Sequence, residues 1–279
     1  MCLEREKVQC PACGPSPSVT IAHRKEPGRK ETYAIVRCRI CGMAFVSPRR
    51  ALALRQREYA SWPGAVAFYR AIEDSSRSAA ASLVSGLTRL NPQARSLLDL
   101  GCGPGFVLES AIDQGLSSLG VEVCSELVDD CCQRGLRVHR SQIESASTGA
   151  HCWDIVVLSQ VLEHVDDPLA VLKVAADAVA ANGIVYIGVP RFDWLERMRA
   201  RVSRHRAEHL WLPESHLYYF TTNAMVALVN RAGMSMVDNT LPLESSSGLA
   251  RIRRKAGAKL GRSPGEWLAR PVEDALSSL

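Results

Sequence analysis

The chain has 279 residues, of which 47% are hydrophobic and 23% are charged, and its formal net charge is +5 at pH 7. These values are those of a globular protein with one large domain, or one domain and an appendage. The mild positive charge permits an acidic ligand without demanding nucleic acid. No apolar run reaches the roughly 18 residues that a membrane helix needs, and the charged first residues lack the apolar region of a signal peptide. We therefore expect a cytoplasmic protein without membrane contact.

Two short cysteine motifs mark the N-terminal part of the chain. Cys10 and Cys13 lie in the segment CPACG, and Cys38 and Cys41 lie in CRICG. Each motif places two thiolates on one tight turn, and disulfides are rare in a reducing compartment. Four thiolates suit a tetrahedral zinc ion, and because the protein fills all four positions, we expect a structural rather than a catalytic zinc. Four free cysteines or a redox pair are the alternatives.

The segment TYAIVRC between the two motifs predicts a strand that leads into the second motif, as in a zinc ribbon. We therefore expect a zinc-ribbon module over residues 1–48. A helical linker is predicted over residues 49–94. Its pattern indicates one helix over residues 51–59, a break at the Trp-Pro-Gly sequence that follows, and a second helix over residues 65–90.

The segment LLDLGCGPGFVLESA, residues 97–111, joins a strand to a helix through three glycines. The short apolar run at residues 96–100 predicts a buried strand, and helical spacing resumes at Phe106. Glycine adopts positive φ and has no Cβ to block a ligand, and the turn presents free amides at a helix N-terminus. The spacing GCGPG differs from the GxGxxG of dinucleotide-binding proteins, and no Gly-Lys-Ser/Thr follows as in a P-loop. The turn therefore predicts a ligand-binding loop of another kind.

Two acidic residues indicate what this loop binds. Asp99 comes just before the first glycine, where a carboxylate would repel a pyrophosphate and suit a cationic or amine-bearing group. Glu122 lies at the end of the apolar segment LSSLGVEV, and an acid at the tip of a second strand can accept hydrogen bonds from both hydroxyls of a ribose. The residues thus predict a pocket for a ribose joined to a positively charged, amine-bearing group without phosphates.

Three separated motifs, DLGCGPG, GVEV and WDIVVLSQVLEHVDDPLAVL, resemble those of class I S-adenosylmethionine-dependent methyltransferases in order and over residues 95–255. The positions that match the family's cofactor contacts are Asp99, Gly101, Gly103, Gly105, Glu122, Gln142 and Ile143. The resemblance implies that the glycines lie against the methionine end of the cofactor, which Asp99 orients. It also implies that Glu122 holds the ribose and that Gln142 and Ile143, after the third strand, flank the adenine.

Strands alternate with helices through the rest of this region. Strands are predicted at residues 154–158, 183–190 and 234–240, and helices at residues 168–181 and 222–232. The alternation favours an α/β fold with a doubly wound, mostly parallel sheet, and the resemblance implies a Rossmann-like methyltransferase fold of seven strands, with an antiparallel seventh at residues 245–255. Ser159 and Gln160 follow the fourth strand, at the carboxyl end where such sheets bind ligands, and are predicted to contact the cofactor.

Three side chains are candidates for the proton transfer that methylation of an alcohol or ammonium group requires. His164, in LEHVDDP, follows the fourth strand at the predicted cofactor edge, and histidine titrates near neutral pH. His216 and Tyr218 lie in PESHLYYFT, which resembles an element beside the active site of similar methyltransferases. The alternatives are that His164 caps a helix or packs against its loop, and that HLYYF is a half-buried strand with its aromatic rings in the core.

The predicted cofactors are S-adenosylmethionine and a structural zinc, and the predicted partner is a small-molecule acceptor such as a sugar, a nucleotide-sugar or a secondary metabolite. The arginine-rich residues 191–210 are either a lid that grips an anionic acceptor or a solvated helix face, and residues 256–279 are a basic tail. An RNA methyltransferase whose ribbon grips nucleic acid and a non-catalytic cofactor-binding regulator are the alternatives. The modest charge weighs against RNA, and the sequence makes no prediction of oligomeric state.

Overall fold

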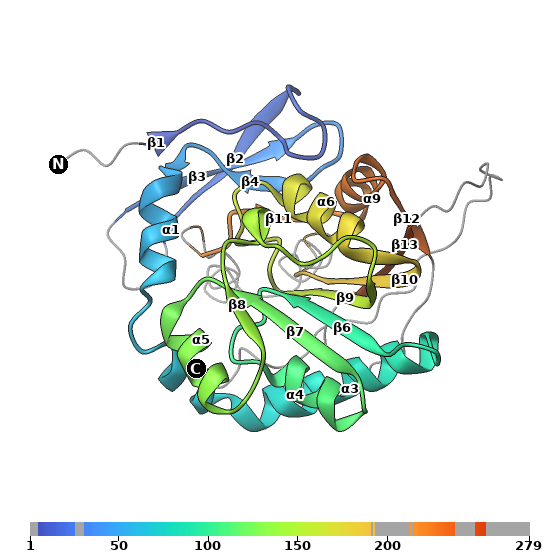
Figure 1. Ribbon diagram of the computed structural model, residues 1–279. Helices are drawn as coiled ribbons and strands as arrows, with labels where there is room; N and C mark the ends of the chain where they lie inside the picture. The colour runs from blue at the N-terminus through green and yellow to red at the C-terminus, as the bar shows by residue number, and fades with distance from the viewer. Residues whose placement is uncertain are drawn as a thin grey trace.

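The centre of the protein is a twisted sheet built mainly from parallel strands. The structure, a computed structural model, describes residues 5–25, 31–190, 192, 213 and 215–237, together with the backbone of residues 249–254. From one edge to the other the strands are β12 (Met234–Val237), β13 (Leu249–Arg254), β10 (Val179–Gly188), β9 (Trp153–Ser159), β6 (Ser96–Leu100), β7 (Ser117–Glu122) and β8 (Val138–Arg140) (Figure 1). The five strands from β10 to β8 are parallel, and β13 is antiparallel to both of its neighbours. The predicted Rossmann-like parallel sheet is thus confirmed for five strands.

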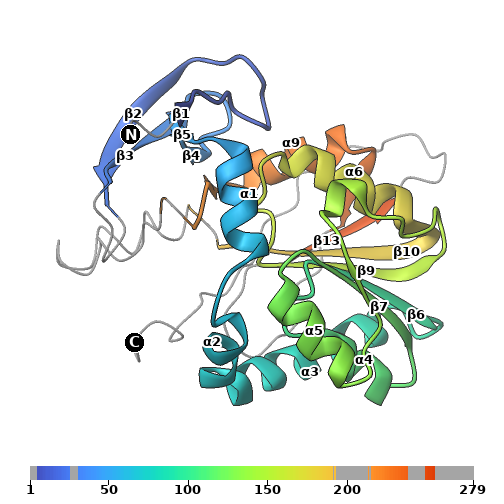
Figure 2. The ribbon, with the colours of Figure 1, turned by 60° about the vertical axis from the view of Figure 1, so that its left-hand side comes forward.

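Helices cover both faces of this sheet (Figures 1 and 2). One face carries α3 (Glu73–Leu90), α4 (Phe106–Asp113) and α5 (Ser125–Gln133), and the other carries α6 (Pro168–Ala178) and α9 (Thr222–Arg231). Consecutive residues of β6 belong to different cores: Leu97 packs with Leu87 of α3, whereas Leu98 packs with Leu172 of α6. A strand buried on both faces needs apolar residues at successive positions, which explains the continuous apolar run in the sequence.

The helix α6 begins where the sequence predicts and ends earlier. The Asp167 carboxylate accepts hydrogen bonds from the amides of Leu169 and Ala170 at 2.9 and 3.1 Å, so Asp167 is the N-cap. The predicted helix end at residue 181 is wrong, because β10 already starts at Val179. A Cβ on Gly183 would lie 2.9 Å from the carbonyl oxygen of Trp153. The glycine therefore lets β10 approach the start of β9 and does not end a helix.

The linker also differs from its prediction in one place. It contains α1 (Leu52–Ala60), and the helix predicted over residues 65–90 is two helices, α2 (Ala65–Ala71) and α3. Ile72 separates them with a non-helical φ of −120°. Glu73 and Asp74 then occupy the first turn of α3, where negative charge is favourable next to the helix N-terminus. This pair of acids explains why a new helix begins there.

The N-terminal strands form a second, smaller antiparallel sheet. In order its strands are β11 (Tyr218–Tyr219), β4 (Ala44–Val46), β3 (Tyr33–Cys38) and β2 (Ser18–Arg24), and β1 (Arg5–Glu6) pairs separately with β5 (Arg49–Arg50). The strand β11 comes from the C-terminal half of the chain, so the N-terminal sheet is completed by the main domain. Figure 2 shows these strands beside α9, with α1 leading away from them toward α2.

Two predicted segments lie outside the described residues. They are the arginine-rich segment 191–210, apart from Phe192, and the tail 256–279. Within the described residues, no helix has the length and apolar character that crossing a membrane requires.

Candidate functional site

The glycine turn follows β6 at the carboxyl edge of the parallel sheet. Gly101, Gly103 and Gly105 have φ angles of 82°, 51° and 77°, a region that favours glycine. A Cβ on Gly101 would lie 2.7 Å from the side chain of Val161, and one on Gly105 would lie 2.5 Å from that of Leu136. Both the backbone conformation and the packing therefore require glycine in this turn.

The Glu122 carboxylate connects the end of β7 to this turn. One of its oxygens, Oε2, accepts a hydrogen bond from the amide of Gly103 at 3.0 Å. The other, Oε1, accepts from the amides of Val123 and Cys124 at 2.7 and 2.8 Å. Burial raises the pKa of Glu122, and the three amides act in the opposite direction. Because Oε2 holds a single amide, it retains acceptor capacity for the hydroxyl group of a ligand.

Asp99 is the second carboxylate at this edge, and it is only 2% exposed. Burial is the main cause that raises its pKa to about 7, and the negative charge of Glu122 adds to the effect. A buried carboxyl group whose ionisation is disfavoured by a second acid is favourable for a positively charged ligand. The structure thus brings together the glycine turn, Asp99 and Glu122, as the sequence predicts.

An aromatic group from the linker, which the sequence analysis did not include in the site, lies against the turn. The hydroxyl of Tyr69 lies 3.6 Å from the position that a Cβ on Gly103 would occupy. Burial, with the charge of Glu122 as the second cause, raises the pKa of Tyr69 to about 12. The ring centroid of Trp62 lies 6.1 Å from those of both Tyr59 and Tyr69. The sequence signal for this group is the density of aromatic residues: four lie within the eleven residues YASWPGAVAFY, in a chain that is only 6% aromatic.

The remaining predicted cofactor contacts follow the neighbouring strands. Ser159 ends β9, and Gln160 follows it with a φ of 54°, which is unusual for a residue with a side chain. The amide of Gln160 donates to the carbonyl oxygen of Gly188 at 2.8 Å. Gln142 and Ile143 come after β8, and Ile143 is buried. These residues lie at the ends of β9 and β8, on either side of β6 and β7, at the carboxyl edge where open α/β sheets bind ligands.

The two predicted catalytic histidines come together from distant parts of the chain. The ring centroids of His164 and His216 lie 4.8 Å apart, with the ring planes at 72°. The Nδ1 atom of His164 lies 2.6 Å from the carbonyl oxygen of Ser215. Since a carbonyl oxygen only accepts, Nδ1 carries the proton and Nε2 carries the lone pair. Burial and the neighbouring His164 lower the pKa of His216 to about 3, so its ring is neutral at pH 7.

The third catalytic candidate, Tyr218, lies in a different environment. Its buried hydroxyl donates to the carbonyl oxygen of Asp166 at 2.6 Å and accepts from the guanidinium of Arg49 at 2.7 Å. Arg49 in turn pairs with the carboxylates of Glu6 and Asp166. The structure therefore ties the Tyr218 hydroxyl to a buried arginine that joins β5 to the main domain.

A buried acid that the sequence analysis did not single out completes the histidine group. Glu163 is fully buried, and neither of its carboxylate oxygens has a hydrogen-bond partner within the described part of the chain. Burial raises the pKa of its carboxyl group to about 8. One ligand atom from each of Glu163, His164 and His216 lies within 4.8 Å of the others. Its position directly before the predicted His164, in an otherwise apolar segment, was the signal.

The four N-terminal cysteines also converge. Their sulfur atoms all lie within 4.8 Å of one another, and those of Cys10 and Cys41 are 3.6 Å apart. Tetrahedral zinc with Zn–S bonds of about 2.3 Å requires sulfur atoms roughly 3.8 Å apart, so the spacing and the soft donor set suit zinc. Each motif closes a tight turn, in which Gly14 donates to the carbonyl of Cys10 at 2.7 Å and Gly42 to that of Cys38 at 3.0 Å.

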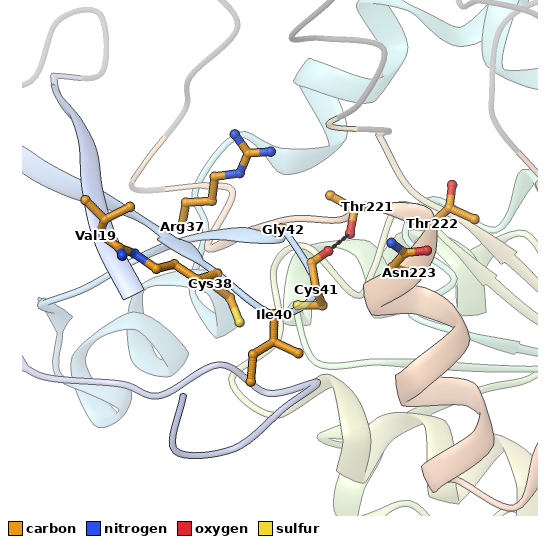
Figure 3. A pocket seen from close by; sticks show the side chains of 10 residues that line it. Val19, Arg37, Cys38, Ile40, Cys41, Gly42, Thr221, Thr222 and Asn223 are labelled. Atoms are coloured by element: carbon orange, nitrogen blue, oxygen red, sulfur yellow. Dashed lines mark hydrogen bonds between the residues drawn. The ribbon is translucent and has the colours of Figure 1, made fainter. Parts of the chain in front are cut away.

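The second cysteine motif is hydrogen-bonded to the main domain. The Thr221 hydroxyl donates to the carbonyl oxygen of Cys41 at 2.7 Å (Figure 3). It also accepts from the amide of Ala224, so it caps α9. A hollow of about 480 Å³ opens beside this link, between residues 38–42 and 221–223. It lies apart from the glycine turn, so it is distinct from the edge where the predicted cofactor contacts gather.

Comparisons with known proteins agree on the class of fold. The model of a family described as a methyltransferase domain matches residues 72–239. A ubiquinone biosynthesis O-methyltransferase of Citrobacter koseri is 31% identical over 99 residues, which are 33% of this chain and 41% of the relative's length. The chain therefore spans less than half of this curated relative.

Two solved structures share the fold at low sequence identity. A 1,6-didemethyltoxoflavin-N1-methyltransferase of Burkholderia thailandensis is 16% identical, with a TM-score of 0.54, over 84% of this chain and 99% of that one. An amino pentose methyltransferase of Micromonospora echinaspora, solved with S-adenosylmethionine, is 17% identical, with a TM-score of 0.51, over 68% of this chain and 95% of that one. At this identity the likeness concerns the fold.

Proposed function

The chain belongs to the methyltransferase domain family, and on that premise we propose that it transfers a methyl group from S-adenosylmethionine to a small-molecule acceptor. The observation that carries the proposal is the hydrogen bond from the amide of Gly103 to the carboxylate of Glu122. It joins the glycine turn, which Asp99 precedes, to Glu122, and Asp99 and Glu122 are the two acids from which the sequence predicts an amine-bearing group and a ribose.

Different residues at the carboxyl edge of the sheet contact different parts of the cofactor. When bound, S-adenosylmethionine supplies a methyl group on a positively charged sulfur together with its leaving group. Asp99 orients the amine-bearing methionine end along the turn formed by Gly101, Gly103 and Gly105. Glu122 accepts hydrogen bonds from the ribose hydroxyls with its remaining lone pairs. The end of β8 and the end of β9 provide the other contacts, from Gln142, Ile143, Ser159 and Gln160.

The linker covers this site. Gly64 and Val66 donate their amides to the carboxylate of Glu126 at 2.8 and 3.1 Å, which fastens the start of α2 to α5. Tyr69 is thereby held against Gly103. Aromatic side chains over the turn exclude water from the cofactor, which favours a displacement that depends on alignment and desolvation.

The acceptor binds on the side of the histidine group. Glu163 and His164 follow β9 after Ser159 and Gln160, so they lie next to the predicted cofactor contacts in the chain. His164 and His216 have neutral rings that can interact with the proton of an acceptor hydroxyl or ammonium group. The name of the curated relative makes a hydroxyl oxygen the acceptor atom that we propose first. Tyr218 positions the loop that carries His216 through its bonds to Arg49 and Asp166.

The N-terminal residues 1–48 form a zinc ribbon with a structural role. Cys10, Cys13, Cys38 and Cys41 would hold the ion with all four positions filled by sulfur. The ribbon strand β4 pairs with β11, and the amide of Val46 donates to the carbonyl of Leu217 at 2.9 Å. Because Leu217 follows His216 directly, the zinc ribbon fixes the acceptor side of the site.

The proposal is tested in two steps on the full chain. Calorimetry with S-adenosylmethionine should show one binding site per chain. Incubation with radiolabelled cofactor and fractionated cell extract should then place the label in a small-molecule fraction, with nuclease-treated extract as the control. Absence of cofactor binding would overturn the proposal, and label that disappears with nuclease treatment would favour the RNA alternative.

A further inference from the structure

The buried carboxylate of Glu163 lacks a partner in the part of the chain that the structure describes, and the proposed methyl transfer does not itself supply one. Its carboxylate is fully buried, and its two oxygens have no hydrogen-bond partner within the described residues. A buried carboxylate without a partner costs several kcal/mol, so native proteins almost always give such a group a hydrogen-bond donor, a proton or a cation. The question is which of these Glu163 is arranged to receive.

The surroundings of Glu163 have the features of a metal site. Ligand atoms of Glu163, His164 and His216 lie within 4.8 Å of one another. The Nδ1–H of His164 donates to the backbone carbonyl of Ser215, which leaves Nε2 as a fixed lone pair. A histidine that ligates a metal typically donates its other ring N–H to a carbonyl or carboxylate in this way.

The backbone holds the two halves of this group in place before any ligand binds. The amide of Leu217 donates to the carbonyl oxygen of Glu163 at 2.7 Å, which joins the segment of Glu163 to that of His216. Pairing of β11 with β4 of the ribbon fixes the same segment from the other side. A preorganised set of donors lowers the entropic cost of binding a small ligand.

We propose that Glu163, His164 and His216 bind a divalent cation such as Mn²⁺, Fe²⁺ or Zn²⁺ beside the predicted cofactor site. Two imidazoles and one carboxylate are a donor set that these ions accept while keeping positions open for another ligand. This set differs from the four thiolates of the ribbon, which leave no open position. The two sites therefore have different chemical preferences and can be loaded separately.

The cation site extends the proposed function, on which this step rests, by naming the class of acceptor. A cation with open positions binds a hydroxyl oxygen best when a second oxygen of the same molecule, on the neighbouring carbon, can also coordinate. The bound hydroxyl loses its proton to water more readily than a free one. Its oxygen then forms a bond to the methyl carbon while the carbon–sulfur bond breaks and its electron pair stays on sulfur. We therefore expect an acceptor with two adjacent oxygens, and the histidines act through the cation.

The test uses the full chain with zinc retained in the ribbon, titrated with Mn²⁺ and followed by the loss of the free-ion electron paramagnetic resonance signal. The wild type should bind one Mn²⁺ per chain without releasing zinc. Glu163→Gln and His216→Ala should each weaken that binding at least tenfold. His139→Ala, which removes an exposed histidine on β8, should bind as the wild type does.

The affinity for S-adenosylhomocysteine, the demethylated form of the cofactor, is measured by calorimetry on the same samples. Unchanged affinity in Glu163→Gln shows that the variant is folded and that the proposed cofactor site is intact. A wild type that binds the cofactor but takes up no Mn²⁺, or a Glu163→Gln variant that takes up Mn²⁺ as tightly as the wild type, would overturn the cation site and leave the methyltransferase proposal standing.

Discussion

Glu122 and Glu163 are both buried acids near the carboxyl edge of the sheet, and they differ in what the chain offers them. Glu122 receives three backbone amides, from Gly103, Val123 and Cys124. Glu163 receives no hydrogen bond on its carboxylate within the described residues. Both acids follow a central strand in sequence. The backbone on the cofactor side is arranged around its carboxylate, whereas on the acceptor side the carboxylate meets two histidine rings.

This difference indicates two kinds of ligand. An acid whose carboxylate is already held by amides is rigid, so it suits a neutral partner that adds one or two hydrogen bonds, such as a ribose. An acid without a donor is stabilised by a positive charge brought from outside. The two sides also depend on different supports, because Glu122 is fixed by its own domain and the His216 segment is attached to the ribbon.

The strongest way to separate the two sides is to remove the zinc that we propose for the four N-terminal cysteines. Structural zinc contributes on the order of 10 kcal/mol of folding free energy in zinc-finger peptides. Chelation should therefore unfold the ribbon and expose the amides of β3, β4 and β11 to hydrogen exchange, while the affinity for S-adenosylmethionine changes by less than about threefold. A protein that contains no zinc when purified, or that loses cofactor affinity together with the ribbon, would contradict this division.

The next effect concerns Asp99 and pH. Its pKa in the folded state, about 7, lies above the reference value of 3.8, so folding disfavours its charged form. The free energy of unfolding is therefore undiminished by this group below about pH 3.8, falls as the pH rises from there toward 7, and levels off above it. For the cofactor-free protein we expect a loss of about 3 kcal/mol between pH 5 and pH 8.5, measured by chemical denaturation.

Asp99→Asn should remove most of that loss, because an amide does not ionise. Asp113→Asn, an exposed position at the end of α4, is the matched control and should keep the full dependence. If Asp99→Asn and the wild type lose stability in parallel, the buried carboxyl is not its source.

The comparison of the two acids is sharpest when both receive the same substitution. Glu122→Gln should lower the free energy of unfolding by about 2 kcal/mol, since charge-assisted hydrogen bonds contribute about 1.5–3 kcal/mol each and the new NH₂ group faces amide donors. Glu163→Gln in metal-free protein should raise it by about 1–2 kcal/mol near neutral pH, because the buried carboxyl, whose pKa is raised to about 8, must take up a proton on folding and Gln need not. Denaturant titration of both variants measures the two changes in the free energy of unfolding. Changes in the same direction would remove the distinction between the two sites.

The smallest expected effect is at the link between the ribbon and α9. Thr221→Val keeps the shape of the side chain and removes its hydrogen bonds to Cys41 and Ala224. Loss of a helix N-cap costs about 1 kcal/mol, which thermal unfolding can resolve. Thr20→Val, at an exposed threonine of β2, serves as the control. The link has no energetic role if both variants melt at the same temperature.

The cofactor side could be predicted from the sequence because its information is local. The glycines, Asp99 and Glu122 lie within 24 residues of one another, and each lies at or near the end of a short, largely apolar strand. The pairing of β11 with β4 could not be predicted in the same way. It joins residues that are more than 170 positions apart, and strands of two and three residues carry no periodicity of their own.

The acceptor side was predicted in part. Sequence reasoning identified His164 and His216, and the structure places their rings together. It did not identify Glu163, since an acid in a loop is usually solvated, and only the fold shows that this one is buried. For Tyr218 the local pattern offered both a catalytic and a core position, and the partners Arg49 and Asp166 become visible only in three dimensions.

The central claim is that the glycine turn and Glu122 together bind S-adenosylmethionine, and calorimetry of the wild type beside Glu122→Ala tests it most directly. We predict one site in the wild type, at least a 100-fold weaker affinity in Glu122→Ala because charge-assisted hydrogen bonds of about 1.5–3 kcal/mol each are lost, and no change in Glu144→Ala, an exposed acid after β8. No heat of binding in the wild type, or an equal affinity in Glu122→Ala, would contradict the account.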